Sequence, residues 1–291
     1  MGHARCGIVI VLLVLSSVVQ RGVASTQYGD AQIQHSRGQN VAPTFEGWIR
    51  NADGSFEFVF GYLNRNYEEV LNIPIGADNS IQPGGPDRGQ PTHFYPRRAK
   101  ALFKVRIPKD WDPKQRVVWS LTAHGRTDVA KGWLQPEWEI EDGLRTREGE
   151  ANTPPAITGS ADQQITWPNR TLSLTLLVND DGKPKPRPRR RPLVVQANPA
   201  IGVVGNAEPD DDDAAAMSLI GGGLAVKWIQ YRGPGNVIFE PSSATKVYGK
   251  PVNLTTSATF SAPGSYLLWA IADDGLISTV HALTVTVTAA K

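Results

Sequence analysis

Cysteine is nearly absent from the sequence. Among 291 residues there is one, Cys6, and it lies ahead of the N-terminal apolar run. A lipoprotein signal carries its cysteine after such a run, so this position disfavours lipidation. If the N-terminal segment is removed, the chain has no disulfide, no thiolate metal site and no cysteine nucleophile. Its stability must then come from hydrophobic cores alone.

Long apolar runs are also missing. The longest, residues 8–15 extended through Val18 and Val19, is shorter than the roughly 20 residues of a comfortable membrane span. It follows Arg5 and precedes the small residues 22–25, which are typical of a cleavage site. We interpret residues 1–25 as a secretory signal peptide, with an uncleaved N-terminal anchor as the alternative. The protein is then secreted, periplasmic or at the cell surface, with no membrane span after cleavage. Secretion without disulfides is more typical of bacterial envelope proteins than of animal extracellular ones.

A net charge of either sign is missing from the processed chain. The full sequence has 30 Lys and Arg against 28 Asp and Glu, and cleavage removes Arg5 and Arg21 but no acid. The two signs then balance, so neither a nucleic-acid partner nor general attraction to anionic membranes is expected.

What is present favours strands and turns. Glycine and proline together account for 50 residues, which suits an all-β protein with many turns. Residues 45–50 and 56–60 alternate apolar and polar side chains around an Asn-Ala-Asp-Gly turn, the pattern of a hairpin. Further predicted strands cover residues 101–107, 117–123, 128–134, 172–178, 224–231, 252–260, 265–272 and 276–288. Between the hairpin and these strands, residues 75–98 form an expected long loop.

The pattern predicts two immunoglobulin-like β-sandwich domains in tandem. We expect a flexible leader (26–42), a first sandwich (43–140), a polar linker (141–155) and a second sandwich (156–288). Residues 183–223 interrupt the second sandwich with a low-complexity insertion. A structureless loop of this length inside a domain is normally functional or disordered.

The second sandwich resembles the PKD and cadherin-like group of immunoglobulin-type sandwiches. The resemblance lies in Asn-Thr-Pro-Pro at 152–155, Asp-Gln-Gln-Ile at 162–165, Asp-Asp-Gly at 180–182 and 273–275, and Trp228 and Tyr266 in their strands. It implies core positions for Trp228, Tyr266 and Trp269, and a tyrosine-corner hydroxyl bond at Tyr266. The first sandwich resembles a segment of uncharacterised secreted bacterial proteins, through residues 60–69, 74–76 and 89–94. That resemblance implies no activity.

The two Asp-Asp-Gly segments are the first candidate site. Each follows a strand, and both strand ends could face one pole of the sandwich. Carboxylates converging there would repel unless a cation lay between them, and Ca²⁺ takes six to eight oxygen ligands. The alternative is that Asp-Gly simply forms turns. The candidate metal ligands are Asp180, Asp181, Asp273 and Asp274; no other cofactor is implied.

The insertion opens with a basic, proline-rich run that is the second candidate site. It could bind an anionic polymer, or it could be a solvated loop screened by the acidic residues 210–213. The candidate anion-binding residues are Lys183, Lys185, Arg187, Arg189, Arg190 and Arg191.

Aromatic residues are the third candidate. Trp111 and Trp138 each lie two residues from a proline and could be exposed, and an exposed indole can stack on a sugar ring. Trp119 alternates with Val117 and Leu121 and is expected in the core.

Catalytic motifs find little support. The sequence has no His-Glu-x-x-His, no Gly-x-Ser-x-Gly and no phosphate-binding loop.

The sequence therefore favours a secreted, non-catalytic binding or structural module of the bacterial cell envelope. Its partner would be an envelope or extracellular protein or polysaccharide, presented to loops that include residues 75–98. The alternatives are a carbohydrate-binding accessory protein and an enzyme with a dispersed active site.

Overall fold

The structure is a computed structural model that describes residues 34–140, 151–184, 224–247 and 249–289. These residues form antiparallel sheets almost throughout, with one short 3₁₀ helix among them, η1 (Pro136–Trp138). The expected signal peptide lies outside the described residues. Within the described ranges, no helix is long and apolar enough to cross a bilayer. The predicted all-β fold class is confirmed.

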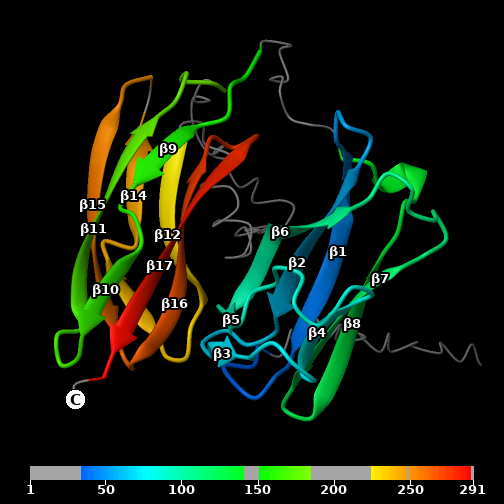
Figure 1. Ribbon diagram of the computed structural model, residues 1–291, viewed down its shortest axis with the longest axis horizontal. Helices are drawn as coiled ribbons and strands as arrows, with labels where there is room; N and C mark the ends of the chain where they lie inside the picture. The colour runs from blue at the N-terminus through cyan, green and yellow to red at the C-terminus, as the bar shows by residue number, and fades with distance from the viewer. Residues whose placement is uncertain (1–33, 141–150, 185–223, 248, 290–291) are drawn as a thin grey trace, which may run out of the picture. The chain divides into compact units, whose positions relative to one another are not determined.

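The first sandwich is built from two three-stranded sheets and a ribbon (Figure 1). One sheet has the order β1-β2-β6, with β1 (Val41–Arg50), β2 (Phe56–Asn64) and β6 (Arg97–Ile107). The other has the order β4-β7-β8, with β4 (Asn79–Gln82), β7 (Val117–Ala123) and β8 (Arg126–Gly132). The ribbon pairs β3 (Leu71–Asn72) with β5 (His93–Phe94). The predicted hairpin is the β1–β2 pair.

The core of the first sandwich is aromatic. Phe60 and Trp119 have no exposed surface, and their rings meet edge to face with centroids 6.0 Å apart. Val117 and Leu121 share the inward face of β7 with Trp119, as the alternation of that strand predicts. Each large side chain buried in this way contributes about 1.5–3 kcal/mol relative to exposure. The prediction that Trp119 is a core residue is confirmed.

β1 begins before the end of the expected leader. Asn40 and Val41 are buried, although the sequence predicts a flexible leader through residue 42. The Asn66 side chain bonds both backbone groups of Gln39 at 2.7 Å, and Arg65 donates to Asn40 Oδ1 at 2.6 Å. These partners lie 27 and 25 positions away in sequence, so no local pattern in the leader could reveal them.

The second sandwich has a four-stranded and a five-stranded sheet (Figure 1). The first has the order β13-β15-β11-β9: β9 (Ala156–Gly159), β11 (Thr171–Asn179), β13 (Val237–Glu240) and β15 (Val252–Phe260). The second has the order β10-β17-β16-β12-β14: β10 (Gln163–Thr166), β12 (Leu224–Arg232), β14 (Ser243–Val247), β16 (Gly264–Asp273) and β17 (Ser278–Thr288). Strands consecutive in the chain are shared between the two sheets, as in an immunoglobulin-like sandwich.

Two aromatic predictions for this core are confirmed. Trp228 is 5% exposed and stacks on Phe239 at a centroid distance of 5.9 Å. Tyr266 is fully buried, and its hydroxyl donates to the Ala262 carbonyl at 2.7 Å, the hydrogen bond of a tyrosine corner. Trp269 differs from the expectation, because it lies on the opposite face of β16. It packs against the core of the first sandwich, stacked on Tyr231.

The strands that the sequence did not predict are short. β4 and β5 lie within residues 75–98, which the sequence suggests are a loop, and β9, β10, β13 and β14 flank the longer strands of the second sandwich. Each has two to five residues, too few to show a period. Their pairing partners are also remote: β4 pairs with β7, and β10 pairs in parallel with β17.

Candidate functional site

Asp274 lies in the turn between β16 and β17, and its side chain is completely buried. Its Oδ1 accepts hydrogen bonds from the backbone amides of Leu276 and Ile277, each at 2.7 Å. Its Oδ2 accepts from the side-chain amide of Asn152 at 2.9 Å. The residue directly after β16 therefore carries a buried carboxylate, which accepts a hydrogen bond from a residue 122 positions earlier in the chain.

Asp180 follows β11 and is 6% exposed. Its Oδ2 accepts from the Gly182 amide at 2.8 Å, and its buried Oδ1 has no hydrogen-bond partner among the residues that the structure describes. Burial raises the pKa of the Asp180 carboxyl above its ordinary value, and the nearby charges of Asp181 and Asp274 raise it further. The structure thus brings Asp180 and Asp274, one from each Asp-Asp-Gly segment, close enough to repel.

Asn152 is the third polar residue at this end of the second sandwich. It is 6% exposed, and within the described ranges its buried side-chain Oδ1 also lacks a hydrogen-bond partner. Its neighbours are bonded to the loop after β11: Thr153 N donates to Asp181 Oδ2 at 3.1 Å, and Lys183 Nζ donates to the Ala151 carbonyl at 2.8 Å. Residues 151–153, which the sequence places in the expected linker, therefore contact this loop. We refer to Asn152, Asp180 and Asp274 as the carboxylate pole.

Asp181 and Asp273, the other two predicted metal ligands, serve as turn residues. Asp181 Oδ1 accepts from Lys183 N at 2.9 Å, and Asp273 Oδ1 accepts from Gly275 N at 2.7 Å, each bond spanning two residues. Asp273 Oδ2 accepts from the Ser278 hydroxyl. Short Asp-to-backbone bonds of this kind form turns and need no ion. The turn interpretation accounts for these two residues but leaves the unpartnered oxygen of Asp180 unexplained.

The carboxylate pole has the ligand chemistry of a hard cation. Among the described residues, no three His, Cys, Asp or Glu side chains come together as a metal cluster. Besides the two carboxylates, the pole offers the buried side-chain oxygen of Asn152. Carboxylate and amide oxygens are the ligands Ca²⁺ prefers, with backbone carbonyls or waters completing its shell. Sequence reasoning did not include Asn152; the available signal was its position before Thr-Pro-Pro, where proline favours an extended backbone.

The basic candidate site lies mostly outside the described residues. Of its six cations only Lys183 is described, and its ammonium is bonded to the Ala151 carbonyl. Lys185, Arg187, Arg189, Arg190 and Arg191 fall in the part of the insertion that the structure does not describe.

The two candidate sugar-binding tryptophans are separated. Trp111 follows β6, packs partly buried against the first core, and donates its indole N–H to the Gln115 carbonyl at 3.3 Å. Trp138 ends η1 and is 39% exposed. It lines a cleft that does not include Trp111.

Residues 87–95, within the expected loop 75–98, bond to the second sandwich. The Thr92 amide donates to the Tyr231 carbonyl at 3.1 Å, and the Tyr231 hydroxyl donates to the Gly89 carbonyl. The Tyr95 hydroxyl accepts from the Gln230 amide at 2.9 Å. These bonds place residues 89–95 against β12; that the segment as a whole faces a partner stays a prediction.

An ion pair joins the same segment to the end of β12. Arg232 forms two parallel bonds to the Asp87 carboxylate, at 2.9 and 3.0 Å, and also donates to the Gln90 carbonyl. The Arg232 guanidinium holds the pKa of the Asp87 carboxyl below its usual range. Because the Asp87 side chain is about half exposed, the ion pair contributes little to the free energy of unfolding. Its main effect is to hold residues 87–90 at the end of β12.

Comparisons with known proteins add little to this description. No protein-family model matches the chain, and no curated protein matches it. Three solved structures are among those similar to it. The N-terminal eight Ig domains of Down Syndrome Cell Adhesion Molecule isoform 1.30.30 share 11% identity over 85% of this chain and 27% of that one, with a TM-score of 0.25. The D00-D0 domain of intimin shares 10% identity over 84% of this chain and 99% of that one, with a TM-score of 0.24. Domains 4 and 5 of the S-layer protein SbsC share 9% identity over 86% of this chain and 98% of that one, also with a TM-score of 0.24.

The chain spans about a quarter of the cell adhesion structure. TM-scores of this size carry no argument about fold or function. The immunoglobulin-like assignment rests on the strand order, the buried Trp228 and the tyrosine corner.

Proposed function

We propose that the protein is a secreted, non-catalytic binding or structural module of the bacterial cell envelope, and that Ca²⁺ at the carboxylate pole stabilises its second, PKD-like sandwich. The observation that carries the calcium proposal is the pair of buried, unpartnered oxygens, Asp180 Oδ1 and Asn152 Oδ1, beside the buried carboxylate of Asp274. A buried acceptor without a donor costs about 1–3 kcal/mol, and more when it is charged. A bound cation removes that cost and the repulsion between the two carboxylates.

The module role is supported by the way the two sandwiches are joined. Hydrogen bonds from residues 87–95 to residues 230–232 fix the segment between β4 and β6 against β12. A scaffold of two sandwiches joined by such contacts positions surface residues for a partner. The partner class is an envelope or extracellular protein or polysaccharide.

Thermal melting of the full chain tests the calcium proposal. We expect about 10 mM Ca²⁺ to raise Tm by about 5–10 °C over EDTA if Kd is near 10⁻⁴ M, since this concentration is about 100 times Kd. Asp180→Asn is expected to abolish the rise. It is also expected to increase Tm in EDTA, because it removes a buried negative charge that is repelled by the charges of Asp181 and Asp274.

Asp273→Asn is the matched control, an Asp-to-Asn change in the second Asp-Asp-Gly segment. Its carboxylate bonds only turn partners, so the calcium response should persist. Equal Tm in Ca²⁺ and EDTA for the unmodified chain, or a full rise in Asp180→Asn, would contradict the proposal.

A further inference from the structure

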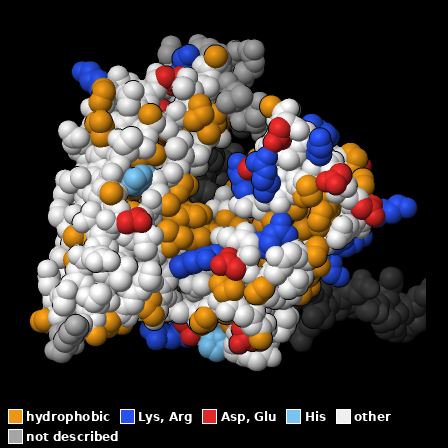
Figure 2. All heavy atoms as spheres, in the orientation of Figure 1, with side chains coloured by type: hydrophobic (Ala, Val, Ile, Leu, Met, Phe, Trp, Pro, Cys, Tyr) orange, Lys and Arg blue, Asp and Glu red, His pale blue; other side chains and the backbone are white. Residues whose placement is uncertain are grey.

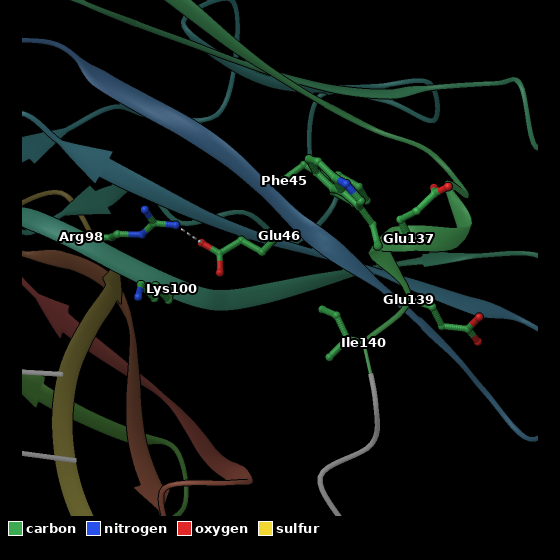
Figure 3. Close-up of a pocket in the computed structure, with 8 residues that line it drawn as sticks. Phe45, Glu46, Arg98, Lys100, Glu137, Glu139 and Ile140 are labelled. Carbon is green, nitrogen blue, oxygen red and sulfur yellow. Dashed lines mark hydrogen bonds and ion pairs between the residues drawn. The ribbon is translucent and has the colours of Figure 1, made fainter. Parts of the chain in front are cut away.

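A cleft of about 550 Å³ lies in the first sandwich between β1, β6 and the segment that follows η1 (Figure 3). This volume is within the roughly 300–1,000 Å³ range of small-ligand sites. The cleft is open to solvent. Its lining residues are Phe45, Glu46, Arg98, Lys100, Glu137, Trp138, Glu139 and Ile140.

The polar wall of the cleft is built around Glu46. A β-bulge between Phe45 and Gly47 leaves Glu46 without a cross-strand partner and turns its side chain over β2. Space for the carboxylate exists because residue 61 is glycine: a Cβ there would lie 2.5 Å from Glu46 Oε1. The side chain of Glu46 is only 14% exposed. Such a carboxylate is fixed in place before any ligand arrives.

The Thr44 hydroxyl of β1 donates to Glu46 Oε1 at 3.1 Å, and strand β6 supplies the other donors that orient Glu46. Ala101 has a positive φ of 46°, a strained conformation for alanine, and its amide donates to Glu46 Oε2 at 3.1 Å. Arg98 Nη2 reaches Glu46 Oε1 at 3.5 Å. Figure 3 shows the Glu46 side chain directed toward Arg98 and Lys100. Bulges and strained residues of this kind concentrate at binding sites.

The apolar wall is formed by Phe45 and Trp138, which belong with Trp133 to a stack of three aromatic rings. Phe45 stacks on Trp138 at a centroid distance of 5.3 Å and an interplanar angle of 18°, and Trp133 lies 5.8 Å from Trp138. η1 holds Trp138 close to β1, and only glycine fits at position 47, because a Cβ there would meet the Trp138 carbonyl oxygen at 2.5 Å. Trp138 is therefore a rigid ring with a large exposed fraction, next to preformed polar groups.

We propose that this cleft binds an uncharged polysaccharide of hexoses with equatorial hydroxyls, with a sugar ring on Trp138 and its hydroxyls on Glu46, Arg98 and Lys100. Hexoses with equatorial hydroxyls have an apolar C–H face that suits an indole, and their hydroxyls bond charged side chains in the plane of the ring. The lining carries three carboxylates and two cations, so it does not attract a polyanion. The site lies in the first sandwich and is independent of the calcium proposal.

Across the face drawn in Figure 2, most charged side chains lie over the first sandwich, and the second is largely uncharged. Positive and negative groups are interspersed on the first sandwich, with no patch of one sign. This distribution also favours a neutral ligand.

The test is binding of the full chain to insoluble cellulose and chitin, and calorimetry with cellohexaose and chitohexaose. We expect binding to at least one, weakened at least about tenfold by Trp138→Ala through loss of ring stacking. Glu46→Gln, which keeps the side-chain shape, should also weaken binding. Trp167→Ala is the matched control, a partly buried tryptophan of the second sandwich that is outside the cleft. It should bind as the unmodified chain does, and Tm of each variant checks its folding.

Two further probes separate the alternatives. Polygalacturonate is an anionic glycan, and a peptide with the sequence of residues 183–192 is a basic, proline-rich ligand for an aromatic groove. Binding to either probe in place of the neutral oligosaccharides would overturn the proposal. So would failure to bind any neutral glycan, or neutral-glycan binding that Trp138→Ala leaves unchanged.

Discussion

Replacing Tyr231 with alanine is expected to lower the free energy of unfolding by about 3–5 kcal/mol, as for other large aromatic side chains removed from a core. Tyr231 is 1% exposed and stacks on Trp269 with centroids 3.5 Å apart. Its hydroxyl donates to the Gly89 carbonyl in the segment that crosses from the first sandwich. Burial raises the pKa of this phenol, so it remains a neutral donor. Urea denaturation measures the loss.

Tyr231→Phe separates the ring from the hydroxyl. It keeps the stack on Trp269 and leaves only the Gly89 carbonyl without its donor, so we expect a cost of about 1–3 kcal/mol. If Tyr231→Ala cost less than about 1 kcal/mol, well below the expected range, the contact between residues 87–95 and β12 would not be part of the folded structure in solution.

Asn79→Ala is expected to cost a similar amount, about 3–5 kcal/mol, although it removes a polar side chain. Asn79 has no exposed surface and makes three hydrogen bonds. Its Nδ2 donates to the carbonyls of Ile73 and Pro91 at 2.9 and 2.8 Å, and its Oδ1 accepts from the Trp119 indole at 3.0 Å. Alanine would leave three buried polar groups unpaired, each costing about 1–3 kcal/mol.

Asn51→Ala is the control for Asn79→Ala. The Asn51 side chain bonds Ser55 in the hairpin turn and is only partly buried, so its removal should cost no more than about 1 kcal/mol. Equal costs for the two variants in urea denaturation would contradict the role assigned to Asn79. That role explains why residues 75–98 are ordered against the core despite their loop-like composition.

The long strands could be predicted because their side chains alternate between core and solvent. β7 and β15 have the predicted bounds, 117–123 and 252–260, and both show clear alternation of burial. β4 and β5 could not be predicted in this way. These strands are held in place by Asn79, a single polar residue whose side chain bonds the distant residues Ile73, Pro91 and Trp119. A Gly- and Pro-rich composition shows where the chain turns, but not which backbone groups a turn will bond.

The candidate site was predictable only in part. Asp180 and Asp274 could be selected because each follows a strand, and strand ends on one side of a sandwich lie close together. The sequence could not separate them from Asp181 and Asp273, since the four share one motif and differ only in burial and bonding. Asn152 was missed because its contact with Asp274 spans 122 residues. Trp138 could be predicted as an exposed residue because Pro136 lies two positions before it. Glu46 could not be predicted as a site residue, because its position in the cleft results from a β-bulge that the sequence pattern does not indicate.

The central claim is that the carboxylate pole binds a cation, and the most direct measurement is calorimetric titration of Ca²⁺ into the metal-free full chain. We predict saturable binding at one site with Kd of about 10⁻⁴–10⁻³ M, the range of extracellular calcium modules. Asp180→Asn should eliminate this binding and Asp273→Asn should retain it. Absence of saturable binding up to about 10 mM Ca²⁺, or equal binding by Asp180→Asn, would contradict the claim.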